Sequence, residues 1–401
     1  MGFTPFWYQA ECINASLNFL TDKKVKGNGL AICPTASGKS LIIANIAQAL
    51  EGMVVVFQPN IEILRQNYEK FLSYDGRGGI YSASAGVKHV SRITYVTIGS
   101  VAKKHHLFDQ VKYILIDECH LVSAEAGMYF DFIKAHPKAK VLGFTATPYR
   151  LSTNVDGAML KFLNRTSPRI FNKVVYSIQN SILFEGGFLA PLRYFDINLI
   201  DATKLKMNAK GTDFTDASIR EYNRSTKMLD RIIEYSNRLL LKRANLLVFC
   251  SLVSEAHQVA KGIPGAVVVH GELDSRDRDK ILKNFKSGII RCVVNVGVLT
   301  TGFDMPTLEA CIIGRKMMSL ALYYQIIGRV MRKFIYPDGT KKVGWVIDFG
   351  GNISFFGKIE TMEIKIDKRG LYSVWNNGRQ LTNVNFTKEK VPPQPVFEEN
   401  E

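Results

Sequence analysis

The sequence lacks the features that mark zinc modules and membrane spans. It has six cysteines, and no two of them show the C-x-x-C spacing that holds zinc. No apolar run approaches the roughly 20 residues that a bilayer span needs, and the stretch from Met1 to Phe6 has no basic segment leading into an apolar core. We therefore expect buried, reduced thiols in an intracellular, cytoplasmic protein that binds neither zinc nor membrane.

Acidic residues are also few relative to basic ones. The 52 lysines and arginines outnumber the 36 aspartates and glutamates, so the formal net charge is +16. Such a surface attracts polyanions, and nucleic acid is the first candidate. Composition alone leaves open a basic protein that merely stays soluble. With 401 residues and 46% hydrophobic side chains, the chain is most simply two domains.

Short β-branched runs alternate with amphipathic stretches in both halves of the sequence. The expected strands lie at 29–33, 53–58, 93–98, 113–116 and 141–144, and again at 246–249, 266–269, 292–296, 311–313 and 343–347. This alternation predicts an α/β fold with two tandem parallel sheets. The glycine pair at 186 and 187 suggests the boundary, giving domains at 1–188 and 189–350 and a short, partly disordered extension at 351–401.

The segment from Ile32 to Ser40 ends a predicted strand and opens a predicted helix. Its backbone N–H groups and Lys39 can cradle phosphates, while Ser40 can reach Mg²⁺. Cys33 replaces the first glycine of the general phosphate-loop pattern, which weakens a bare motif match. The context along the chain must support the assignment.

A second predicted strand ends in an acidic pair. Asp117 can hold Mg²⁺ through water, and Glu118 can orient the attacking water of ATP hydrolysis. The alternative is that the two acids only cap the following helix. Strand, phosphate loop and acidic pair in this order favour an ATPase site.

The segment from Gln325 to Arg332 is predicted to be helical. On a helix, Arg329 and Arg332 lie nearly one turn apart on one face, where both can reach one phosphate. An arginine of this kind stabilises charge on the γ-phosphate. As an isolated pattern, two such arginines are more often a solvated face or a simple phosphate grip.

Several segments together are similar to the motifs of superfamily 2 helicases, in order and in spacing. They are 34–40, 117–120 (Asp-Glu-Cys-His), 145–148 (Thr-Ala-Thr-Pro), 249–251, 269–271, 300–304 and 325–332. The resemblance covers roughly residues 1 to 350, and the Asp-Glu-Cys-His box favours DNA motors over DEAD-box RNA helicases. Residues 346–357 resemble RadD-like and phage UvsW-like repair and recombination helicases, which points to a bacterial or phage-infected host cell.

This resemblance implies two RecA-like domains with ATP in the cleft between them, and a role for each matching residue. The ATP-binding residues would be Gln9, Pro34, Thr35, Ala36, Ser37, Gly38, Lys39, Ser40 and Asp304, with Ser40 and Asp117 serving Mg²⁺. Glu118, Gln325, Arg329 and Arg332 would be catalytic, and His120, Thr145 and Thr147 would couple hydrolysis to motion. Gln9 would read adenine, the alternative being an amphipathic first helix with Gln9 exposed.

The implied track is DNA, single-stranded, forked or branched, gripped mainly by its backbone and travelled 3′ to 5′ by a monomer. The expected contacts are Pro59, Arg65, Thr97, Gly99, Ser100, Ser251, His270 and Thr300. Backbone contacts predict little sequence preference and strong salt dependence. Single-strand-binding or recombination proteins are expected partners. An RNA helicase, the motor subunit of a restriction-type complex and a non-catalytic ATP-gated clamp stay open as alternatives.

Overall fold

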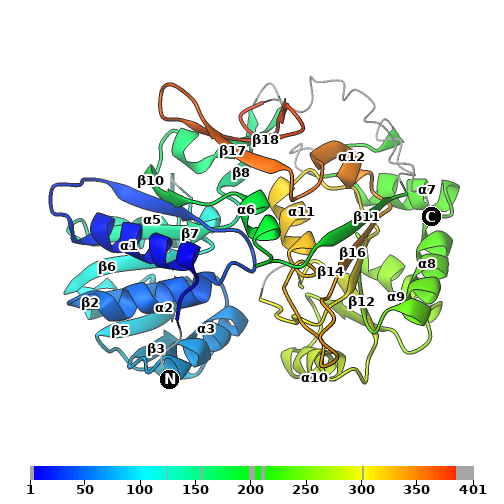
Figure 1. The fold of residues 1–401 in the computed structure, drawn as a ribbon, viewed down its shortest axis with the longest axis horizontal. Coiled ribbons are helices and arrows are strands. Elements are labelled where there is room, and N and C mark those ends of the chain that lie inside the picture. The colour runs from blue at the N-terminus through cyan, green and yellow to red at the C-terminus, as the bar shows by residue number, and fades with distance from the viewer. Residues whose placement is uncertain are drawn as a thin grey trace. The chain divides into compact units, whose positions relative to one another are not determined.

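The computed structural model describes residues 4–123, 125–154, 157–197, 204–208, 213–299 and 302–384. The chain divides into two compact units (Figure 1). The first comprises Met1–Arg150, Lys161–Gln179 and Ile364–Ser373, and the second comprises Leu151–Leu160, Asn180–Glu363 and Val374–Glu401. The units change over at Gln179, a few residues before the expected boundary at 188, and that expected boundary stays a prediction.

The first unit is built on an eight-stranded sheet of order β10-β1-β7-β6-β2-β5-β3-β4. All its pairings are parallel except that of β3 with β4. Its strands are β1 (Asn28–Ile32), β2 (Met53–Gln58), β3 (Gly79–Ser82), β4 (Val87–Lys88), β5 (Ile93–Thr97), β6 (Val111–Asp117), β7 (Lys140–Thr145) and β10 (Phe171–Ser177). Its helices are α1 (Trp7–Thr21), α2 (Lys39–Ala49), α3 (Ile61–Ser73), α4 (Ile98–Val101) and α5 (Met128–Ala135), with 3₁₀ turns at His105–Phe108, Cys119–Leu121 and Leu163–Arg165.

Helices cover both faces of this sheet. Figure 1 shows α1, α2 and α3 along one face, where buried side chains such as Ile13, Ile46 and Phe71 share one apolar cluster with the strands. On the other face, Phe132 of α5 packs edge-to-face on Phe57 of β2, with ring centroids 5.0 Å apart. A sheet buried on both sides needs strands that are apolar throughout, which is why runs such as 53–58 signal it in the sequence.

The second unit holds a six-stranded parallel sheet of order β11-β16-β15-β12-β14-β13. Its strands are β11 (Leu192–Asp196), β12 (Leu246–Phe249), β13 (Val267–His270), β14 (Cys292–Val296), β15 (Ala310–Ile313) and β16 (Gly344–Asp348). Its helices are α6 (Asn180–Glu185), α7 (Asp216–Ser225), α8 (Met228–Lys242), α9 (Val253–Lys261), α10 (Ser275–Lys286), α11 (Leu320–Ile327) and α12 (Asn352–Phe356). Side-chain caps begin several of them: the Ser319 hydroxyl accepts from the N–H of Leu322 at the start of α11.

Two small sheets complete the described chain. One joins β8 (Tyr149–Asn154) to β9 (Gly157–Phe162), and the other contains β17 (Met362–Ile366), β18 (Tyr372–Asn376) and β19 (Arg379–Gln380). Within the expected extension, residues 351–384 include α12 and these three strands, and Phe356 and Leu381 are buried there. The partial disorder expected of the extension stays a prediction. Residues 385–401 lie outside the described part. No described helix is long and apolar enough to cross a membrane.

Candidate ATP site and nucleic-acid contacts

The loop between β1 and α2 has the backbone shape of a phosphate cradle. Gly38 adopts a φ of +88°, and a Cβ there would strike the Gln9 amide, so only glycine fits. The Cys33 N–H donates to the Thr145 carbonyl at 3.0 Å, and the Ser37 N–H donates to Pro34 at 3.2 Å. Gly38 provides no side-chain cap, so the first N–H groups of α2 lack a capping oxygen and suit an anion.

Lys39 and Glu118 face each other at this loop. Lys39 Nζ lies 3.5 Å from Glu118 Oε1, and the two side chains are only 11% and 19% exposed. Glu118 precedes the 3₁₀ turn at Cys119–Leu121 but makes no side-chain capping bond to it. The geometry therefore favours the ATPase interpretation of this acid over the helix-cap alternative.

Asp117 lies at the centre of a buried polar network. The Asn67 side-chain NH₂ donates to Asp117 Oδ2 at 3.1 Å and to Gln58 Oε1 at 2.7 Å, and its Oδ1 accepts from the Ser40 hydroxyl at 2.6 Å. Burial raises the pKa of Asp117 to about 7, with a further rise from Glu118 and an opposing effect of Lys39. The network connects the two residues expected to serve Mg²⁺.

Sequence reasoning did not identify Asn67 and Gln58. Both are buried, Asn67 at 5% exposure on α3 and Gln58 at the end of β2. A polar residue on the apolar face of an amphipathic helix is the one sequence signal that could have found Asn67. Its partners come from three other elements, so the network itself is visible only in the fold.

His120 joins the acidic pair to the end of β7. Its Nδ1 lies 3.0 Å from the Thr145 hydroxyl, 3.2 Å from the Thr147 hydroxyl and 3.3 Å from Glu118 Oε2. The side chains of His120, Thr145 and Thr147 are all buried. The structure thus brings the three residues expected to couple hydrolysis to motion into one contact group.

Gln9 is buried at 3% exposure, so the alternative of an exposed Gln9 is wrong. Its Oε1 accepts from the Phe6 N–H at 2.9 Å, and its Nε2 donates to the Ser37 carbonyl at 2.8 Å. The amide thus ties the start of α1 to the phosphate loop. Its contact with adenine stays a prediction, and exposed Phe6 and Trp7 lie beside it.

The expected arginine helix is shorter than predicted. Gln325 lies on α11, but that helix ends at Ile327, so Arg329 and Arg332 lie beyond it and not on one helical face. Gly328 occupies the C-cap, and glycine is a poor helix former. Arg329 donates to the Phe303 carbonyl, and Arg332 forms an ion pair with Asp304. Both arginines thereby attach to the segment that contains the expected ribose contact.

Most of the expected nucleic-acid contacts lie at or just after strand ends within each unit. In the first unit, Thr97 ends β5, Pro59 follows β2, Arg65 lies on α3, and Gly99 and Ser100 lie on α4. In the second unit, His270 ends β13 and Ser251 follows β12. The carboxyl ends of parallel strands share one edge of a sheet, where ligands of such folds bind. Thr300 lies outside the described residues.

The loop between β1 and α2, the strand-end acidic pair and the parallel sheet are together typical of phosphate-loop nucleotide hydrolases. Residues 2–150 match the family model of the type III restriction enzyme res subunit, and residues 226–334 match the helicase conserved C-terminal domain. The chain belongs to the superfamily 2 helicases, which are nucleic-acid-dependent ATPases.

Three relatives illustrate the likeness. A 51.5 kDa protein of a Lactococcus phage is 28% identical over 75% of this chain and 61% of the relative. DNA 3′-5′ translocase XPB2 of Sulfurisphaera tokodaii is 23% identical over 81% and 78%, and ATP-dependent DNA helicase uvsW of Enterobacteria phage T4 is 24% identical over 86% and 68%. The chain thus spans less than two thirds of the Lactococcus phage protein.

Solved structures show the same fold. The fragment structure described as an HsdR subunit of a type I restriction enzyme from Vibrio vulnificus YJ016 has a TM-score of 0.65 at 20% identity, over 94% of this chain and 70% of that chain. The expectation of two tandem RecA-like domains with parallel sheets is confirmed.

Proposed function

We propose that this protein is a DNA motor that uses ATP and Mg²⁺ to move along DNA and to unwind or remodel forked or branched DNA. The observation that carries the proposal is the cluster at the phosphate loop in which the Lys39–Glu118 pair meets the hydrogen-bonded network of Ser40, Asn67 and Asp117. The formal net charge of +16 supports a polyanionic track. Relatives named as a DNA translocase and a DNA helicase support DNA in particular.

The donors at the loop fit Mg²⁺. The Ser40 hydroxyl and the Asp117 carboxylate are hard oxygen ligands, and Asn67 links them. Bound Mg²⁺ would neutralise charge on the β- and γ-phosphates. Lys39 and the N-terminus of α2 would hold those phosphates, and Glu118 would accept a proton from the attacking water.

In the second unit, Arg329 and Arg332 would act on the γ-phosphate. The ion pair of Arg332 with Asp304 holds that guanidinium close to the residue expected to bind the ribose. Hydrolysis would remove the γ-phosphate and with it the contact that the two arginines make. His120, with Thr145 and Thr147, would pass the change from the acidic pair to β7. Gln325 would help to position the water.

The DNA strand would lie along the residues expected to contact its backbone, at and near the β-strand ends of each unit. The motor would move 3′ to 5′ as a monomer. XPB2 is named as a 3′-5′ translocase, which supports this polarity. Contacts confined to phosphate and sugar would make the logarithm of affinity fall linearly with the logarithm of salt concentration. Sequence preference should be small.

ATP hydrolysis tests the proposal directly. We expect slow turnover without nucleic acid, strong stimulation by single-stranded and forked DNA, and little by RNA, with the stimulated rate lost in Glu118→Gln. Duplexes with a 3′ or a 5′ tail then report polarity through strand separation. Stimulation by RNA but not by DNA would mean that the protein is an RNA helicase. Absence of hydrolysis under every condition would favour an ATP-gated clamp.

The res-subunit family match favours a second candidate, the motor of a restriction-type complex. Among the described residues, no group of three or more metal-binding side chains stands ready to form a nuclease centre. Such a motor would hydrolyse ATP on DNA and would cut it only when a nuclease partner is added. Strand separation by the purified chain alone distinguishes the helicase from it.

A further inference from the structure

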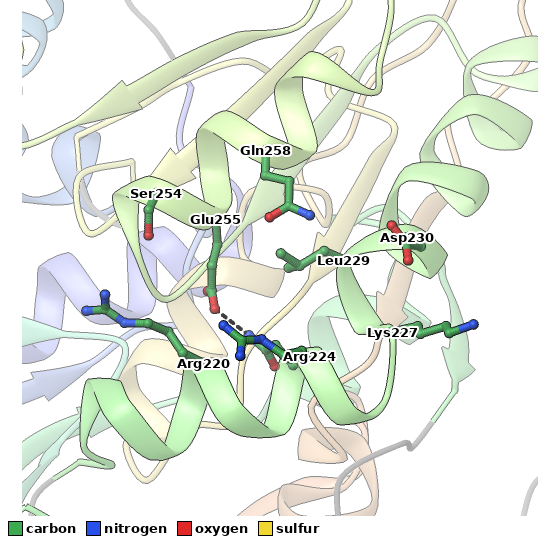
Figure 2. Close-up of a pocket in the computed structure, with 9 residues that line it drawn as sticks. Arg220, Arg224, Lys227, Leu229, Asp230, Ser254, Glu255 and Gln258 are labelled. Carbon is green, nitrogen blue, oxygen red and sulfur yellow. Dashed lines mark hydrogen bonds between the residues drawn. The ribbon is translucent and has the colours of Figure 1, made fainter.

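A cavity lies in the second unit between α7, α8 and the start of α9 (Figure 2). Its volume is about 330 Å³, within the range of small-molecule sites. Arg220 and Arg224 of α7 and Lys227, between the helices, form an exposed basic rim. No residue expected to bind ATP or DNA lines it.

The floor of the cavity is a buried carboxylate with one unused oxygen. Glu255 and Asn223 are 6% and 4% exposed, and Asn223 donates to Glu255 Oε1 at 2.7 Å. Within the described part of the chain, Glu255 Oε2 is buried and has no hydrogen-bond partner. Burial raises the pKa of Glu255, and the bond from Asn223 opposes the rise. A buried acceptor of this kind needs a donor.

The charges around the cavity restrict what can fill it. Figure 2 shows Arg224 reaching from α7 toward the Glu255 carboxylate, while Arg220 extends along the rim away from it. A bare anion would meet the rim favourably but would be repelled by Glu255 at the floor and by Asp230 at the side. A bare cation would meet the opposite conflict. The cavity therefore suits a ligand with an anionic group at one end and an N–H donor at the other.

A nucleotide with an amino-bearing base has both groups. Guanidinium groups bind phosphate through charge-assisted, often bidentate, hydrogen bonds. The cytosine amino group donates to a glutamate carboxylate in direct base recognition, whereas thymine presents an acceptor at the same place. Leu229 and Gln258 also line the cavity and offer an apolar side chain and an amide.

We propose that this cavity binds one nucleotide, with its phosphate on Arg220 and Arg224 and the amino edge of its base on Glu255 Oε2. The inference rests on the proposed function where the nucleotide belongs to a DNA strand. A free nucleotide has the same chemistry. The site would give a base preference to a motor whose other contacts read only the backbone.

Binding of labelled oligo(dC) and oligo(dT), measured by fluorescence anisotropy without ATP, tests the base edge. One hydrogen bond predicts roughly fivefold tighter binding of oligo(dC). Glu255→Gln keeps an oxygen for Asn223 and places an NH₂ group where Oε2 was, so the preference should reverse toward thymine O4. If oligo(dC) and oligo(dT) bind equally well to the unmodified chain, and again equally well to Glu255→Gln, the proposal is overturned.

The rim is tested separately, because Glu255 is buried and its variant could fail to fold. Arg224→Ala should weaken both oligonucleotides about equally while keeping their ratio. Arg238→Ala removes a 70% exposed arginine of α8 outside the cavity and should leave the affinity for both oligonucleotides unchanged. Equal weakening by both variants would mean a general charge effect and would overturn the site.

Titration with free dCMP and dTMP separates this site from the proposed function. Tighter binding of dCMP than of dTMP that is lost in Arg224→Ala would support the cavity site, even if no oligonucleotide binds. Absence of oligonucleotide binding would contradict the DNA motor but not the cavity site. Oligonucleotide binding without base preference, together with no dCMP binding, would overturn the cavity and leave the motor standing.

Discussion

Replacing Asn67 by alanine removes the centre of the polar network under the phosphate loop. The asparagine side chain makes three hydrogen bonds, accepting from Ser40 and donating to Gln58 and Asp117. It is 5% exposed, so water cannot readily replace these partners. The variant leaves Gln58 and Asp117 short of a donor inside the fold.

The size of the effect follows from the bond types. Two neutral hydrogen bonds and one to a carboxylate together stabilise the native state by about 3 to 4 kcal/mol. Alanine recovers roughly 0.5 kcal/mol through its higher helix propensity at this position of α3. We therefore expect the first unit to lose about 3 kcal/mol of stability. The pKa of Asp117 should rise further, because the bond from Asn67 lowers it.

Hydrogen exchange in the whole chain measures this loss where it occurs. The amides of α3 and β6 should exchange with an opening free energy lower by about 3 kcal/mol in Asn67→Ala. Glu69→Ala, an exposed position of the same helix, is the matched control and should leave exchange nearly unchanged. Protection in Asn67→Ala equal to that of the control would refute the reasoning, because the network would then contribute no stability.

Three further predictions follow from the buried groups. Glu118→Gln should slow DNA-stimulated ATP turnover by about 10² to 10⁴, the contribution of a positioned base, with nucleotide binding retained in a filter assay; a smaller loss would contradict its role. Burial lowers the pKa of Lys316 to about 8 and that of Lys342 to about 7. Each lysine therefore binds fewer protons in the folded state than in the unfolded state above these values, so the thermal midpoint of the unmodified chain should gain on that of Lys342→Met from pH 7.5 to 8.5; a difference between the two midpoints that shrinks over this range would contradict this. All six cysteines are free and buried, so a thiol reagent should label them only after denaturation, and fast labelling of the native protein would count against the fold.

Much of the fold could be predicted because parallel sheets buried on both faces require continuous apolar strands. Residues 53–58, 246–249 and 292–296 coincide with β2, β12 and β14 to the residue. Strand β10 escaped prediction, because it pairs with β1 at the edge of the sheet and mixes buried with exposed positions. Edge strands carry a weaker apolar signal because less of their surface is covered.

The site divides in the same way. Lys39, Asp117 and Glu118 could be found because each ends a strand or opens a helix, and local sequence determines that position. The termination of α11 before Arg329 depended on one glycine within an otherwise helical pattern. Asn67 could not be assigned a function from its helix, because its role depends on hydrogen bonds to Gln58, Ser40 and Asp117 on other elements.

The register of the first sheet explains why the expected coupling residues lie where a change at the phosphate loop can reach them. Ile32 of β1 pairs with Thr145 of β7, and the Cys33 N–H donates to the Thr145 carbonyl. The first residue of the phosphate loop and the coupling threonine are thus neighbours across one ladder. On the side-chain side, the Thr145 hydroxyl lies 3.5 Å from Glu118 Oε2, and His120 Nδ1 lies 3.3 Å from that oxygen and 3.0 Å from the hydroxyl. Two connections from the nucleotide side, one through backbone and one through side chains, therefore meet at Thr145. A close-packed interior transmits small shifts, so displacement of either connection should move the end of β7.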